Sequence, residues 1–330
     1  MTTSKQRRRV IKLMAASLAA CAAPQAAMAL TLGTRLHHWQ GFALGAEVSL
    51  QLYHPDAKAA QRIIEKSVRI IHNMETLFSL HQERSVVSTL NRQGVVHNPP
   101  AEFVDLLQTA QGISQMTSGA FDITVQPLWQ FYQARFSGAD QGKGPLEEKL
   151  QAIRGHIGYQ KMSISRQEVS FDQPGMAATL NGIAQGYVTD RVSDYLKSEG
   201  LTAVLVDIGE YMALGPQADQ TPWRIGLADP LNFGGIAHIL NLRQGAVATS
   251  AGRGDSFDRN GEFHHLFDPR TGKSAHRYSS VTVTAPEATL ADALSTAFYA
   301  MPVAAIKECL LHYPEVNARL TDQAGAVIIV

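Results

Sequence analysis

Cysteine is scarce in this sequence. Only two of the 330 residues are cysteines, Cys21 and Cys309. Removal of an N-terminal segment that contains Cys21, or lipidation of Cys21, leaves Cys309 without a partner, which excludes a framework of internal disulfides. Cys309 lies in an amphipathic stretch, residues 304–311, so we expect it to be a buried packing residue and not a nucleophile.

A net charge and long apolar runs are also lacking. The 29 Lys and Arg residues balance the 29 Asp and Glu residues, and a chain with no basic excess is not expected to bind nucleic acid. With 45% hydrophobic and 18% charged residues, the composition excludes a disordered chain. The apolar run over residues 10–20 is too short to span a bilayer as a helix. The composition therefore predicts a folded globular protein.

The first 29 residues have the pattern of an export signal. They contain five basic residues and no acidic residue, and Ala-Met-Ala at residues 27–29 matches a signal peptidase site. Arg7 and Arg8 resemble the start of a twin-arginine signal, with an ordinary secretory signal as the alternative. Leu-Ala-Ala-Cys, ending at Cys21, resembles a lipobox, with a chance match as the alternative. We therefore predict an exported, periplasmic protein that is either soluble or anchored to the membrane as a lipoprotein.

Residues 30–330 mix helical and strand patterns without a regular βαβ alternation, so we predict an α+β fold in a single domain. Apolar residues at helical spacing or in alternation mark the expected elements. We expect helices over residues 63–78, 103–116, 183–196 and 289–301, and strands over residues 47–52, 203–208, 278–284 and 324–330. Gly and Pro residues make 136–146 a flexible loop.

Two glycine-containing stretches have unusual combinations of residues. Residues 119–128 (GAFDITVQPL) turn at Gly119 and place an acid beside an aromatic residue; a strand entry with Asp122 as a turn cap explains this equally well. Residues 180–187 (LNGIAQGY) place glycines at a helix start, where a phosphate or metal can approach the backbone. Helix packing through small residues is the alternative, and the stretch lacks the spacing of a nucleotide-binding loop.

Two further stretches carry acids, hydroxyls and histidines. Asp292 and Thr296 are four residues apart and share one face of a helix, and such a pair suits Mg²⁺, which takes its other ligands from phosphates and water. The alternative is a capping box with Thr289 as N-cap. In residues 263–272 (FHHLFDPRTG), adjacent histidines point to opposite sides of a strand, so one of them is a candidate for a general base or a phosphate contact.

Together these stretches resemble the ApbE family, the FAD:protein FMN transferases. The matching pieces stand in the family order over nearly the whole chain: residues 119–128, 181–187, 248–250, 265–272 and 291–296. The resemblance implies an ApbE-like, T-fold-related architecture with mixed or antiparallel sheets packed against helices. It also implies that FAD is the substrate and that Mg²⁺ lies on its pyrophosphate. The Thr or Ser hydroxyl of a target flavoprotein attacks the FMN-side phosphorus, and AMP leaves.

The resemblance also implies roles for individual residues. Asp292 is implied as a catalytic and metal-binding residue, and His265 as the base for the hydroxyl or as a phosphate contact. The other implied metal ligands are Gly182 through its carbonyl, Ser295 and Thr296. The implied FAD-binding residues are Leu44, His81, Ala120, Phe121, Asp122, Thr179, Gln185 and Leu266.

Two single positions and one five-residue stretch depart from the usual family pattern. Thr179 stands in place of an acid and Gln185 in place of a lysine, which cancel in charge. Asp207-Ile-Gly-Glu-Tyr211 stands in place of Asn-Ile-Gly-Gly-Asn. With the twin-arginine start, these departures resemble the NosX-like branch, whose members serve nitrous oxide reduction by flavinylating the membrane protein NosR. A NosR-like protein is therefore a candidate partner.

Two other functions are compatible with the same residues. One is a pyrophosphatase that splits FAD into FMN and AMP with water as the acceptor. The other is a flavin-binding accessory protein without catalysis, which the altered positions Thr179 and Gln185 leave open. AMP formation separates an enzyme from a binder, and covalent flavin on a target separates a transferase from a hydrolase.

Overall fold

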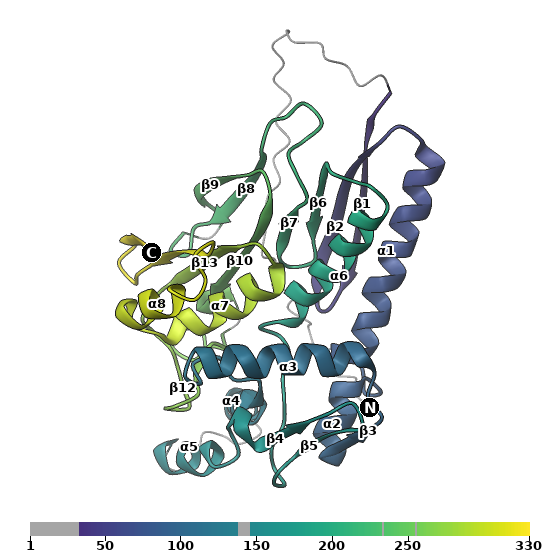
Figure 1. Cartoon of the computed structure of the whole chain (residues 1–330). Helices are drawn as coiled ribbons and strands as arrows, with labels where there is room; N and C mark the ends of the chain where they lie inside the picture. Colours follow the sequence, from purple (N-terminus) through teal and green to yellow (C-terminus); the bar gives the residue numbers. More distant parts are fainter. Residues whose placement is uncertain (1–32, 138–145, 233, 255) are drawn as a thin grey trace, which may run out of the picture.

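The computed structural model describes residues 33–137, 146–232, 234–254 and 256–330 (Figure 1). The predicted export signal with Cys21 and most of the predicted 136–146 loop lie outside the described residues. Among the helices of the described ranges, none combines the length and the apolar character that a membrane crossing requires.

One large antiparallel sheet forms the frame of the molecule, and each neighbouring pair of its strands is antiparallel. In spatial order its strands are β1 (Arg35–Ala43), β2 (Ala46–His54), β6 (Val204–Asp207), β7 (Tyr211–Ala213), β10 (Gly245–Ala251), β13 (Ser280–Ala285), β14 (Asn317–Thr321) and β15 (Val327–Ile329). The predicted α+β class is confirmed.

Helices cover one face of this sheet, and a hairpin covers part of the other (Figure 1). Val204 and Val206 point to the helical side, while Leu205 packs with Trp223 on the opposite side, as strand alternation requires. The helices are α1 (Ala57–Phe78), α6 (Ala184–Ser198), α7 (Ala288–Ala300) and α8 (Val303–Leu310), and the hairpin strands are β8 (Trp223–Ala228) and β9 (Ile236–Leu242). Cys309 of α8 is buried, as predicted.

A smaller helical part lies below the sheet in Figure 1. Its elements are α2 (Val86–Gln93), β3 (Val95–His97), α3 (Ala101–Met116), the 3-10 turn η1 (Ile123–Val125), α4 (Gln126–Phe136), α5 (Leu146–Arg154), the 3-10 turn η2 (Tyr159–Lys161), β4 (Met162–Ile164) and β5 (Glu168–Phe171). The short strands pair in the order β3-β5-β4. A further 3-10 turn η3 (Gly252–Gly254) and a small hairpin of β11 (Phe267–Asp268) and β12 (Lys273–Ser274) complete the described elements.

The segment after α3 corrects one expectation. Residues 119–128 were compatible with a strand entry, but they form the turn η1 and the first part of α4. Pro127 explains the difference, because it lies in the first turn of α4, where proline removes no helical hydrogen bond and its fixed φ favours a helix.

The close contact of α6 and α7 depends on Gly186. A Cβ atom at this position would lie 2.3 Å from the carbonyl oxygen of Ala288 and 2.9 Å from Cβ of Asp292. The two helices therefore approach one another more closely than any side chain on Gly186 would allow. Helix packing through a small residue, one of the two alternatives for this stretch, is confirmed.

We expect Gly186→Ala to destabilise the protein, because the helices must separate to accommodate the methyl group; overpacking of this kind costs about 1–3 kcal/mol. The matched control is Gly112→Ala in the middle of α3, where an added Cβ meets no atom within 4 Å. That change should stabilise the protein by about 0.5–1 kcal/mol through helix propensity. Urea unfolding measures both changes. Equal effects of the two substitutions would show that the contact at Gly186 tolerates a side chain.

Candidate active site

A row of oxygen atoms lines the middle of α7. Asp292 is only 4% exposed, and its Oδ2 atom accepts a hydrogen bond of 3.0 Å from the Gly186 amide of α6. One turn later, Thr296 lies against the backbone of Gly182, where an added Cβ would be 2.8 Å from Thr296 Oγ1. The structure thus brings Asp292, Thr296 and Gly182 together, as the metal-site prediction requires.

Hydroxyl groups from β10 and α7 extend this row. Ser250 Oγ lies 2.8 Å from Ser295 Oγ and 3.4 Å from Thr296 Oγ1. Ser295 Oγ also donates a 2.9 Å hydrogen bond to the Asp292 carbonyl. Ser295 is therefore engaged inside the protein, whereas Thr296 faces Gly182. We name Gly182, Ser250, Asp292, Ser295 and Thr296 the oxygen face.

A second buried acid, Asp190 of α6, fixes the start of α7. Its carboxylate accepts hydrogen bonds of 2.8 Å from the Ala288 and Thr289 amides and of 2.5 Å from Thr289 Oγ1. The N-cap residue of α7 is Glu287, and Asp292 bonds to α6 instead of to its own helix start. The capping-box alternative for Thr289 and Asp292 is therefore wrong, because a carboxylate from another helix satisfies the free amides.

Burial is the main reason that three acids at and near the oxygen face have raised pKa values. Burial, and then the charge of Asp190, raise the pKa of Asp292 to about 7, against the hydrogen bond from Gly186. Burial, and then the charges of Asp292 and Asp207, raise the pKa of Glu210 well above its usual value. Burial also raises the pKa of Asp207 to about 6. A divalent cation at the oxygen face would offset the mutual repulsion of these groups.

The two departures before and within α6 have clear places in the structure. Gln185 lies over Gly209, whose φ is +86° and where an added Cβ would be 2.5 Å from Cδ of Gln185. Thr179 donates its amide to the Ile123 carbonyl at 2.7 Å, and its hydroxyl accepts from the Asn181 amide at 3.3 Å. The first of these bonds joins the segment before α6 to the turn that follows Asp122.

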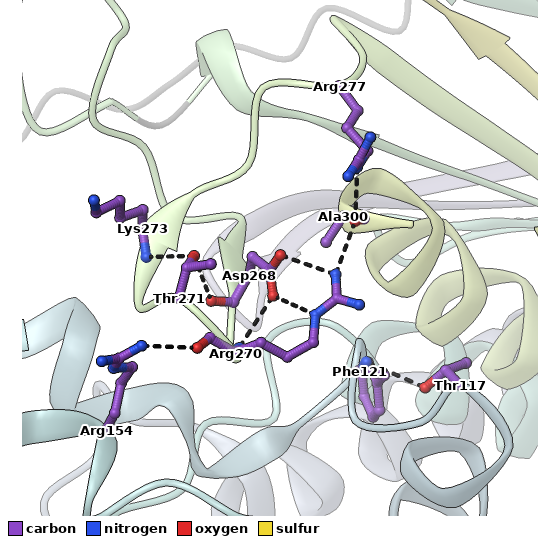
Figure 2. A network of polar contacts seen from close by, with 9 residues as sticks. All are labelled: Thr117, Phe121, Arg154, Asp268, Arg270, Thr271, Lys273, Arg277 and Ala300. Atoms are coloured by element: carbon purple, nitrogen blue, oxygen red, sulfur yellow. Dashed lines mark hydrogen bonds and ion pairs between the residues drawn. The ribbon is translucent and has the colours of Figure 1, made fainter. Parts of the chain in front are cut away.

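The predicted flavin-binding residues after α3 form a tightly bonded segment. Ala120 and Phe121 are buried, and the Phe121 amide donates to Thr117 Oγ1 at 3.2 Å (Figure 2). The Asp122 carboxylate accepts from the amide and the hydroxyl of Thr124 and from the Tyr159 amide. Asp122 is thus the turn cap that the alternative interpretation expected, and its contact with a flavin stays a prediction.

Leu44 and His81 lie next to one another at the β1–β2 turn. Leu44 (φ +50°) and Gly45 (φ +82°) form a two-residue hairpin turn of the type that needs two positive φ angles. An added Cβ on Gly45 would lie 3.7 Å from His81 Nε2, and the Leu44 amide donates to Glu75 Oε1 at 3.1 Å. A leucine in this conformation is strained, and such strain is frequent at functional positions.

The two histidines lie before the short strand β11 and not within it. A single bridge joins His264 to Ser256, and β11 begins only at Phe267. His264 is buried, with its pKa lowered to about 4 chiefly by burial, and its Nδ1 accepts from the Leu266 amide. His265 is half-buried and therefore better placed than His264 to meet a substrate. Leu266 is buried.

The donor atoms of the oxygen face suit a hard cation. They comprise a buried carboxylate, hydroxyls and a backbone that only a glycine allows to approach Thr296, and Mg²⁺ prefers such oxygen ligands. In the described ranges no group of three or more His, Cys, Asp or Glu side chains is arranged to hold a metal. A cation here would therefore rely on one carboxylate, with phosphate and water as further ligands.

Fold and site together define a mixed α+β protein in which an oxygen-lined helix faces a glycine-containing helix start. The chain belongs to the ApbE family, which matches residues 44–320. Two similar proteins are the FAD:protein FMN transferases of Vibrio cholerae and Haemophilus influenzae. They are 28% identical to this chain over 278 and 309 residues, which cover 80% and 87% of this chain and 81% and 84% of the relatives.

Solved structures have the same fold. The ApbE protein of Thermotoga maritima superposes with a TM-score of 0.76 at 29% identity, and the match covers 89% of this chain and 96% of that protein. The flavin transferase ApbE of Vibrio cholerae gives a TM-score of 0.74 at 23% identity, with 90% and 97% covered. The predicted family and fold are confirmed.

Asp190, Ser250 and Glu210 were not predicted from the sequence as site residues. Asp190 follows Gly186 by four residues and so shares its helix face, which is the one signal that pointed to it. Ser250 was part of a matching motif without an assigned role. Glu210 was noted only as a departure, and its proximity to Asp292 depends on the sheet order, which the sequence does not display.

We expect Asp292→Asn to make the cation-free protein more stable above pH 7. Because the pKa of Asp292 is about 7 in the folded protein and about 4 in an unfolded chain, the folded state binds the extra proton between these values. The wild type therefore loses stability as the pH rises from about 4 to about 7, by about 1.4 kcal/mol per unit of pKa shift. Asparagine keeps an acceptor for the Gly186 amide without the charge.

Urea unfolding at pH 5 and pH 8 in the presence of EDTA measures this effect. The control is Glu65→Gln on the exposed face of α1, which should leave the pH dependence of stability unchanged. A stabilisation by Asp292→Asn that is the same at both pH values would contradict the role of the buried charge.

Proposed function

We propose that this protein is a Mg²⁺-dependent FAD:protein FMN transferase that acts on an exported flavoprotein. The observation that carries the proposal is the oxygen face: a buried Asp292 and Thr296 on one side of α7, opposite the Gly182 backbone. This face stands in a chain of the ApbE family, and the relatives named above are FAD:protein FMN transferases.

The reaction forms one phosphoester and breaks one bond of the FAD pyrophosphate. The hydroxyl oxygen of an acceptor Thr or Ser attacks the FMN-side phosphorus, and AMP leaves with the bridging oxygen. The hydroxyl proton passes to a base, for which His265 is our candidate. When bound, Mg²⁺ supplies positive charge to the pyrophosphate oxygens.

The residues of the chain mainly orient the reactants, as is usual for phosphoryl transfer. Asp292, Thr296 and the Gly182 carbonyl would hold the cation. Ala120, Phe121 and Leu266, which are buried apolar residues, are the proposed contacts of the flavin ring, with Leu44 and His81 as further predicted contacts.

The site and the acceptor are proposed to meet on the periplasmic side of the membrane. The support is the export signal predicted for residues 1–29, with a lipid on Cys21 as one form of the mature protein. Thr179 and Gln185, which resemble the NosX-like branch, support a narrower proposal in which the acceptor is a NosR-like protein of nitrous oxide reduction.

The test combines the mature protein with FAD, Mg²⁺ and the periplasmic FMN-binding domain of a NosR-like protein. We expect a fluorescent flavin band on that domain after denaturing electrophoresis, with release of AMP. Asp292→Ala should lower the rate at least about 100-fold, because an electrostatic contact of the reacting groups is lost. Asp194→Ala, which removes an exposed acid from α6, should leave the rate unchanged.

Other outcomes separate the alternative functions. AMP release without a fluorescent band, with this and with other acceptor domains, would replace the transferase by an FAD pyrophosphatase. Bound FAD without any AMP would contradict catalysis. A band that persists in EDTA would contradict the dependence on Mg²⁺.

A further inference from the structure

The segment that carries His265 and Leu266 is one arm of a closed hairpin. Its two strands pair through Phe267 with Ser274 and Asp268 with Lys273. Ser274 Oγ donates to the His264 carbonyl at 2.8 Å and accepts from the His264 amide at 2.9 Å. The hairpin, which we define as residues 264–275, therefore moves as one unit, and its position determines where His265 lies.

Arg270 at the tip joins this hairpin to α7, as Figure 2 shows. Its Nε and Nη2 atoms form a fork on the Asp268 carboxylate, with distances of 2.8 and 2.9 Å. The same Nη2 donates to the carbonyl of Ala300, the last residue of α7, at 3.2 Å. The planar guanidinium holds both partners in a fixed geometry, which a lysine does not reproduce.

Arg277 provides a natural comparison. Its Nε donates to the same Ala300 carbonyl, also at 3.2 Å (Figure 2). Both arginines thus satisfy a free carbonyl at the end of α7, but of the two only Arg270 is also bonded to Asp268 in the described contacts. The Arg270 side chain is 48% exposed, and ion pairs at such exposure contribute little to stability.

We propose that Arg270 is a positioning residue that sets the hairpin with His265 and Leu266 at a fixed place relative to α7 and its oxygen face. The proposal rests on the proposed function, in which His265 and Asp292 serve the same phosphoryl transfer. The first turn of α7 is held by Asp190 and its last residue by Arg270, so both ends of the helix are tied to segments that carry site residues. A shift of the hairpin by about 1 Å is enough to lower turnover about 100-fold.

The test compares Arg270→Ala with Arg277→Ala in the full protein. At saturating FAD and Mg²⁺ we expect Arg270→Ala to lower kcat about tenfold or more, and Arg277→Ala to keep kcat within about twofold. Arg270→Lys and Asp268→Asn should lower kcat as Arg270→Ala does, because each variant loses the two-bond fork between the guanidinium and the carboxylate. The thermal midpoints of Arg270→Ala and Arg277→Ala should be similar, since each loses one bond to Ala300 and the exposed fork on Asp268 contributes little to stability.

Equal kcat values for Arg270→Ala and Arg277→Ala would overturn the proposal, as would full activity in Arg270→Lys. FAD affinity, measured by flavin fluorescence, separates this proposal from the proposed function. If the wild type binds FAD but transfers no FMN, the proposed function fails. In that case kcat cannot be compared, and weaker FAD binding by Arg270→Ala than by Arg277→Ala still supports the positioning role, whereas identical dissociation constants overturn it.

Discussion

The contact between α6 and α7 at Gly186 is the constraint on which the site depends. Because Gly186 has no side chain, its amide reaches the Asp292 carboxylate, and Asp190 one turn further reaches the free amides of Ala288 and Thr289. Asp292 of α7 thus bonds to the backbone of α6, and Asp190 of α6 bonds to the backbone of α7. The same approach places Gly182, just before α6, against Thr296. A wider helix spacing would break all of these contacts at once.

The buried acids that this arrangement brings together lower the stability of the folded protein. Asp292, Glu210 and Asp207 each have a raised pKa with burial as the main cause, and Glu210 also experiences the charges of the other two. Burial destabilises the charged form of these carboxylates, so they lower the stability of the cation-free protein at neutral pH. A bound cation would stabilise the same charges. Burial of Ala291, Ala293 and Ala297 of the same helix in the main core contributes stability against this cost.

The sequence allowed the fold class, the family and the helix with Asp292 and Thr296 to be predicted, because short local patterns indicate each of them. Asp292 and Thr296 are four residues apart on one helix, and residues 181–187 lie directly at a helix start. Contacts between distant segments could not be predicted in this way. The order of the strands in the sheet brings Glu210 close to Asp292. The amides at the start of α7 bond to Asp190 of another helix and not to a residue of α7 itself. The helical form of residues 123–136 was missed although Pro127 favoured it.

The order of strands in the large sheet also determines when the site can form. Leu50 of β2 pairs with Val206 of β6, and β10 pairs with β13, so the frame closes through segments that are far apart in the chain. Such long-range pairing folds slowly, because long loops must close before the contacts form. A nascent chain that ends before α7 contains the turn after α3 and Gly182 but neither Asp292 nor Thr296. The proposed contacts with FAD and a cation are therefore complete only on a finished and folded chain.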